Sequence, residues 1–175
     1  MMRCSALVAW AIFMYSVVCG GQEANAPTEP KRVKGAGISI SAPAGWTVDT
    51  SGKTGVPLAL KHPSFAENGI NITALSVETG SAMNNDQVRQ MIADLAAKRG
   101  LTVVRDEIRS VGAFENGYIA ILENAVSGDR LTQAVHVLQR DGRFIVLTCT
   151  ARSDQYAQHA DSLRAIIETV RPESS

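Results

Sequence analysis

The side chains of this sequence best suited to catalysis or metal binding are those of three histidines, His62, His136 and His159, and of the cysteine Cys149. A hydrolase needs a nucleophile beside a general base, with a carboxylate that orients the base. The sequence contains no Gly-x-Ser-x-Gly motif, and Cys149 falls inside an apolar strand pattern (RFIVLTCTA) rather than at an exposed turn. We therefore expect no catalytic residues, and a hydrolase is the least favoured function class.

The same side chains are poorly spaced for a metal ion. The histidines lie far apart, and His159 has no second histidine four residues away on its predicted helix. Structural zinc sites draw on closely spaced His and Cys ligands. The other two cysteines, Cys4 and Cys19, lie near the N-terminus, so neither a metal pair nor a disulfide framework is predicted. We expect no metal and no cofactor.

Two further patterns resemble functional motifs but predict structure instead. Asp106 and Glu107 are neighbours in a predicted strand, so their carboxylates point to opposite faces and cannot share a substrate. Gly35-Ala36-Gly37 leads into a strand, whereas a phosphate-binding loop leads out of a strand into a helix.

Composition narrows the class of partner. Apolar residues make up 45% and charged residues 19% of the 175 positions, which suits one globular domain. Lys plus Arg and Asp plus Glu number 17 each, so no net field attracts nucleic acid. Aromatic residues are only 5%, which also argues against stacking on bases. We expect the partner to be another envelope or secreted protein, and we expect no nucleic-acid partner.

The N-terminus predicts export. Arg3 precedes a 13-residue apolar run, residues 6–18, which matches a signal-peptide core and is too short for a membrane span. We predict a signal peptide over residues 1–20, a disordered tether over 21–34 and one domain over 35–172. Cys19 is either lipidated or removed with the signal, and cleavage near Ala24–Ala26 is also open. The mature protein is expected to be periplasmic and to meet the membrane only through such a lipid.

Hydrophobic periodicity predicts the elements of the domain. Strands are expected at 37–42, 56–61, 70–77, 101–108, 118–126, 131–139 and 143–151, and helices at 84–99 and 154–170. The last three strands form a meander whose second turn is Asp141-Gly142, a pair that favours a two-residue hairpin. Both faces of the meander are apolar, so other elements must pack against each of them. The turn at Pro43–Trp46 is expected to bury Trp46.

This order of elements resembles PsbP-like and DcrB-like proteins. The resemblance rests on GISISAPAGW, a middle helix, the meander, and FIVLTCTA leading through Asp154 and Tyr156 into an amphipathic helix. It covers about residues 35–172. It implies an α+β fold, an α/β/α sandwich with a central, mainly antiparallel sheet and two packed helices. Members of that family are chiefly binding proteins without a shared catalytic set.

The sequence thus favours a non-catalytic binding or scaffolding protein of the cell envelope. Its contact residues are expected to include Trp46, Phe65, Tyr118 and His136. An exported immunity or inhibitor protein is the alternative, and it would use loops such as 63–69 or 127–130.

Overall fold

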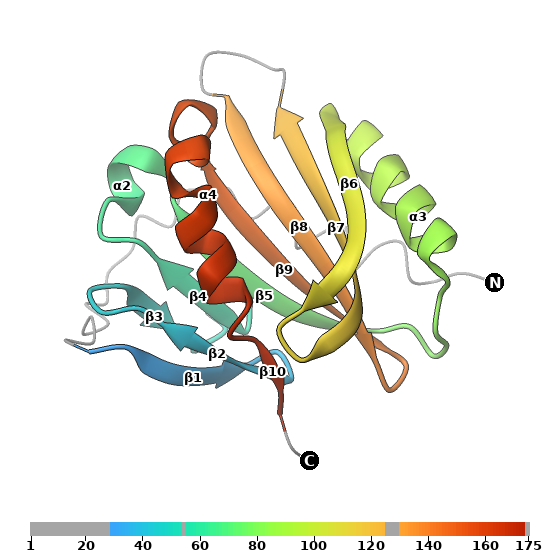
Figure 1. The fold of residues 1–175 in the computed structure, drawn as a ribbon, viewed down its shortest axis with the longest axis horizontal. Helices are drawn as coiled ribbons and strands as arrows, with labels where there is room; N and C mark the ends of the chain where they lie inside the picture. Colours follow the sequence, from blue (N-terminus) through green and yellow to red (C-terminus); the bar gives the residue numbers. More distant parts are fainter. Residues whose placement is uncertain (1–28, 54, 125–129, 174–175) are drawn as a thin grey trace.

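The computed structural model describes residues 29–53, 55–124 and 130–173. These residues form a seven-stranded antiparallel sheet, a smaller three-stranded sheet and three helices (Figure 1). In chain order the elements are β1 (Lys31–Gly35), β2 (Ile38–Ala42), β3 (Thr47–Asp49), β4 (Leu58–Lys61), α2 (Phe65–Asn68), β5 (Asn71–Glu78), α3 (Asn85–Ala97), β6 (Leu101–Val111), β7 (Phe114–Asn124), β8 (Leu131–Arg140), β9 (Arg143–Arg152), α4 (Ser153–Ile167) and β10 (Arg171–Pro172). The large sheet has the order β3-β4-β5-β9-β8-β7-β6, and the small one β1-β2-β10.

The two long helices pack on opposite faces of the large sheet. Alternation along β8 shows this: Val135 and Val137 join the core under α3, whereas Ala134 and Leu138 join the core under α4. Strand residues alternate between faces, so each face of β8 is buried under a different helix. The predicted α+β fold, with helices on both sides of a central antiparallel sheet, is confirmed. The small sheet packs against the α4 side through the buried residues of β2.

The meander of β7, β8 and β9 is confirmed, and its second turn is the predicted one. Asp141 and Gly142 have φ angles of 51° and 71°, as a two-residue hairpin with both central residues left-handed requires. The turn between β6 and β7 depends on Gly112, because a Cβ there would lie 2.3 Å from the carbonyl oxygen of Val170. That close approach fixes the β6–β7 turn against the chain leaving α4.

Helix α3 begins and ends close to its predicted positions. Asn84 accepts from the backbone N–H of Gln87 at 2.9 Å, and the Gln87 side chain accepts from the Asn84 backbone, which completes a capping box. Gly100 follows with φ of 67°. The predicted apolar stripe is buried, and its fully buried members are Val88, Ile92, Leu95 and Ala96.

One N-terminal prediction was wrong. Residues 31–34, expected in the tether, belong to β1, because β1 pairs with β2 from Lys31 opposite Ala42 to Gly35 opposite Ile38. The strand predicted at 37–42 is confirmed as β2, which belongs to the small sheet. Residues 1–28 lie outside the described part, and with them the predicted signal peptide and Cys19.

The C-terminal helix also differs from its prediction. It ends at Ile167, since the chain then turns so that the Val170 carbonyl accepts the Ala113 N–H at 3.1 Å and β10 pairs with β2. Arg152 occupies the cap position without a side-chain bond, because its guanidinium has no acceptor for the N–H groups of the first turn. The Ser153 hydroxyl accepts from Thr132 at 3.0 Å. The predicted loop 63–69 contains the one-turn helix α2. Within the described ranges, no helix has the length and apolar character that crossing a membrane requires.

Candidate functional site

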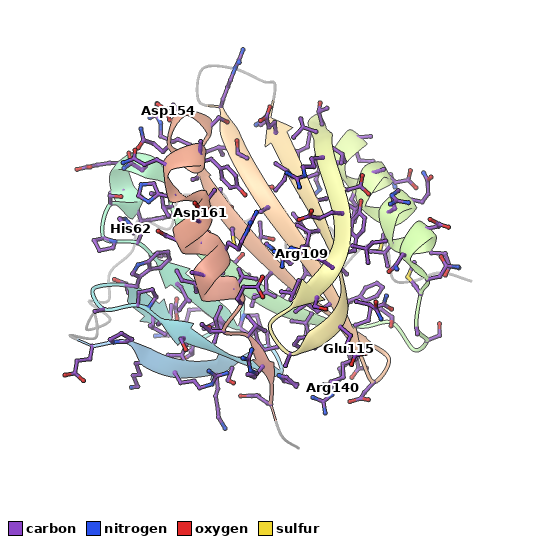
Figure 2. All side chains as sticks on the ribbon, viewed as in Figure 1. His62, Arg109, Glu115, Arg140, Asp154 and Asp161 are labelled. Atoms are coloured by element: carbon purple, nitrogen blue, oxygen red, sulfur yellow. The ribbon has the colours of Figure 1, made fainter. Side chains whose placement is uncertain are left out.

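Helix α4 crosses one face of the large sheet and leaves a recess on each of its sides. The recess toward β6, here named the α4–β6 cleft, has a volume of about 210 Å³. Its buried floor contains Ile119, Ala134, His136 and Cys149, and its mouth contains Arg105, Glu107, Arg109 and Arg164. The recess on the other side, here named the Trp46 groove, has a volume of about 420 Å³ and is lined by Trp46, His62, His159 and Thr169 among others. Figure 2 shows Arg109 between α4 and β6, and His62 across the helix.

The polar group of the cleft floor is His136 on β8. Its side chain is 5% exposed, and its Nδ1 is buried without a hydrogen-bond partner. Burial, with a further contribution from the positive charge of Arg109, lowers the pKa of His136 to about 4. The ring is therefore neutral at pH 7. Strand alternation explains its position, because His136 shares the α4 face with Ala134 and Leu138.

The other reactive groups of the cleft are also held in their neutral forms. Cys149 is 1% exposed, and burial raises the pKa of its thiol to about 12. Burial likewise raises the pKa of the Tyr156 phenol to about 12. A thiol of this kind is a poor nucleophile at neutral pH, since the thiolate is the reactive form.

Charged side chains close the mouth of the cleft. Arg105, Glu107 and Arg109 alternate along β6 and so share one face: Arg105 Nη2 lies 3.0 Å and Arg109 Nε 3.3 Å from the Glu107 carboxylate. Arg109 Nη1 also lies 2.5 Å from Glu168 Oε1, beyond the end of α4. Burial tends to raise the pKa of Glu168, but the Gly112 N–H at 3.0 Å and Arg109 outweigh it, so that pKa is lowered.

This arrangement is suited to binding. The floor contains the neutral His136 ring, with its Nδ1 enclosed, between apolar walls, and the mouth has charges of both signs. Within the described residues, His136 makes no hydrogen bond to a carboxylate that would orient it as a base, and Arg164 forms no ion pair. Among the same residues, no three or more His, Cys, Asp or Glu side chains lie close enough together to hold a metal ion.

The Trp46 groove contains a cluster of three rings in edge-to-face contact that the sequence does not predict. The His62 ring lies edge-on to Trp46 and to His159, with centroid distances of 5.3 Å in both cases. His62 Nδ1 accepts the Ser64 backbone N–H at 3.0 Å, so the proton of the neutral ring sits on Nε2. The two histidines join α4 to the end of β4.

The four predicted contact residues do not form one site. Trp46 is 6% exposed in its groove, and Phe65 lies half-buried on α2 with Lys61 Nζ 5.0 Å from its ring centroid. His136 forms the cleft floor, on the other side of α4. Tyr118 is 2% exposed and belongs to the core under α3, on the opposite face of the sheet.

Sequence reasoning missed the mouth of the cleft. Arg109 and Glu168 meet although they lie on different elements far apart in the chain, so no local pattern reveals the pair. The alternation of Arg105, Glu107 and Arg109 is a signal for one charged strand face.

Known structures show what this arrangement of elements resembles. The solution structure of cyanobacterial PsbP (CyanoP) from Synechocystis superposes with a TM-score of 0.63 at 15% identity, covering 89% of this chain and 99% of that one. The fold is PsbP-like. This confirms the resemblance predicted from the sequence, at the level of the fold alone.

Two further structures share this PsbP-like fold. LpqN, involved in cell envelope biogenesis of Mycobacterium tuberculosis, has a TM-score of 0.52 at 17% identity and covers 86% of this chain and 87% of its own. The Ran-binding protein Mog1p of Saccharomyces cerevisiae has a TM-score of 0.53 at 12% identity, with coverages of 83% and 96%. No family model and no curated protein match the sequence.

Proposed function

We propose that this protein is a non-catalytic binding or scaffolding protein of the cell envelope, exported and held at the membrane by its N-terminus, whose protein partner inserts a side chain into the α4–β6 cleft. The observation that carries the proposal is the buried, unpartnered Nδ1 of His136 at the floor of that cleft.

The size of the cleft favours a single anchoring side chain over a free small molecule. Its volume of about 210 Å³ is below the roughly 300 Å³ at which small-molecule sites begin. Protein interfaces, in contrast, concentrate their binding energy in one or a few side chains that fill a desolvated pocket.

The chemistry of the cleft supports an anchor with an apolar body and a polar tip. An unsatisfied buried polar atom costs about 1–3 kcal/mol, and a partner whose anchor turns the His136 ring and hydrogen-bonds to its enclosed Nδ1 recovers that cost. Ile119 and Ala134 would contact the apolar body. Arg164 at the mouth is available for a charge-assisted bond to the partner.

Export and anchoring rest on the N-terminal sequence. The apolar run at 6–18 and Cys19 at its end support a signal peptide followed by lipidation, and the chain up to Pro30 then serves as a tether. Cys19→Ser tests this: we expect loss of acyl label and release from the membrane fraction. An unchanged membrane fraction would contradict the anchor but not the cleft.

Photocrosslinking in cells tests the cleft. A benzophenone side chain at Ala160, which lines the cleft, should give one discrete protein adduct, whereas the same group at the exposed Gln158, on the opposite side of α4, should give none. His136→Leu should abolish the Ala160 adduct. Equal adducts at both positions, or none at Ala160, would contradict the proposal. A toxin or an enzyme in the adduct would favour an immunity or inhibitor protein over a scaffold.

A further inference from the structure

The last strand of the large sheet, β6, has a free edge. It follows β7 in the strand order and pairs with no other described strand along its 11 residues. Val104 and Ile108, with 50% and 42% exposure, are the exposed large hydrophobic residues of the described chain, and both lie on β6. A long edge strand with exposed apolar side chains is a template for pairing with another strand.

Helix α3 lies beside β6, and Arg89 of α3 pairs with Asp106 (Figure 1). It packs over one face of β6, where Leu101 and Val103 contact its core cluster. A bulge between Val103 and Arg105 interrupts the register with β7, and pairing is then regular from Arg105 opposite Ile121 to Arg109 opposite Gly117. Val104, the extra residue of the bulge, is thus outside the core.

The charged side chains of β6 determine which strand can pair with its free edge. Charged side chains and bulges often protect edge strands against unwanted pairing. Here, however, Arg105 and Glu107 flank Asp106 symmetrically. An antiparallel copy of the same strand, centred on Asp106, therefore meets each arginine with a glutamate.

We propose that β6 is a homodimer interface, at which a second copy of this chain pairs antiparallel around a two-fold axis at Asp106. Arg105 of each copy then lies opposite Glu107 of the second copy, and Val104 lies across from Ile108. The two Asp106 carboxylates face each other, but each is already neutralised within its own copy by Arg89 Nε at 2.7 Å. The neighbouring register centred on Glu107 places Glu107 opposite Glu107 and Arg105 opposite Arg109, which cross-strand pairing disfavours.

This dimer is independent of the proposed binding function. Arg105 and Glu107 point to the α4 face, so the seam runs along the mouths of both α4–β6 clefts without filling them. The dimer would present two clefts on one continuous sheet face.

Charge reversal tests the register. The full chain, purified in mild detergent, is followed by sedimentation over a range of concentration and salt. We expect a dimer that weakens with salt, and an association constant that falls about tenfold or more in Arg105→Glu and in Glu107→Arg. The double swap should restore it. Arg143→Glu, a reversal in the exposed pair with Glu78 away from β6, should leave association unchanged. A monomer at all concentrations, or a double swap that stays dissociated, would overturn the proposal.

A cysteine at the two-fold axis gives a second measurement that does not depend on charge. Opposite residues of an antiparallel pair lie about 4.5–5.5 Å apart between Cα atoms, which a disulfide spans. With Cys4→Ser and Cys19→Ser in every variant, oxidation should therefore crosslink Asp106→Cys to itself, but not Thr102→Cys or the chain without an added cysteine. Cys149, the remaining native cysteine, is 1% exposed and does not compete. Equal crosslinking of Thr102→Cys and Asp106→Cys would contradict the register.

Discussion

The two faces of the central sheet are covered by one long helix each, but they are closed to different degrees. Under α3 the core cluster consists of apolar side chains and Tyr118, and the helix stripe closes over it. On the other face, α4 packs onto Leu138 and Leu147 but leaves the α4–β6 cleft and the Trp46 groove at its sides. Each face contains a buried polar atom without a hydrogen-bond partner, Thr148 Oγ1 on the α3 face and His136 Nδ1 on the α4 face. The comparison indicates that the faces differ in closure, because among the described residues only on the α4 face does such an atom lie beside a recess.

Two neighbouring residues of β7, one on each face, should show the largest difference in stability when they are truncated. Leu122 points under α3 with no exposed surface, while Ile121 is half-buried at the cleft. Leu122→Ala should lower the free energy of unfolding by about 2–5 kcal/mol, because it leaves a cavity in a closed core. Ile121→Ala should cost about 1 kcal/mol, since the side chain already borders a recess. Urea unfolding measures both, and equal losses would mean that the faces are equally closed.

The next largest effect is the contribution of His136 to the pH dependence of stability. Its pKa is about 4 in the folded protein, against an ordinary value of 6.5. Between these values the unfolded chain binds a proton that the folded protein does not, so stability falls as pH drops from about 6.5 to about 4. The full effect is about 3 kcal/mol. In His136→Leu the fall in stability between pH 7 and pH 4, measured from urea unfolding, should be smaller by about this amount. The remaining slope should include the contribution of His62, whose pKa is also lowered.

The same substitution separates stability from binding. At pH 7, His136→Leu removes an unsatisfied buried polar atom and should leave the protein as stable or more stable, by up to about 1–3 kcal/mol. It should nevertheless abolish the cleft adduct. A destabilised His136→Leu protein would indicate that the ring is a structural part of the core instead.

Local patterns were sufficient for most of the fold. The 3.6-residue stripe gave α3 and α4, and the Asp141-Gly142 pair gave the β8–β9 turn, because each depends on residues close together in the chain. The strand β1 was missed because KRVKG has a single apolar residue, Val33, and forms a strand only by pairing with β2. Tertiary pairing there overrides a polar sequence.

The site was less predictable than the fold. Strand alternation placed His136 on the α4 face, but nothing local indicates that its Nδ1 lacks a partner. The contact of His62 with His159, and that of Arg109 with Glu168, depend on how α4 lies across the sheet. Such contacts follow from topology and not from spacing in the chain.

The Arg109–Glu168 pair, which closes one end of the cleft, gives a smaller effect. Glu168→Gln should cost about 0.5–1 kcal/mol, because both side chains are partly exposed and solvent screens the pair. The lowered pKa of Glu168 means that this contribution is present above its ordinary pKa of 4.5 and is lost as pH falls through the folded value. Glu78→Gln, in the more exposed pair with Arg143, should change stability by less at every pH.

The smallest expected effect is a change in the pKa of His62, which is in edge-to-face contact with His159. It contrasts this pair with His136. Burial and, secondly, the charge of His159 lower the pKa of His62. His159→Gln removes the second cause and keeps a polar side chain, so the pKa of His62 should rise but remain below 6.5. Ring-proton NMR titration measures this, and the His136 titration should not change, because burial dominates there. An unchanged His62 would mean that burial alone sets its pKa, and that the two histidines of the Trp46 groove titrate independently.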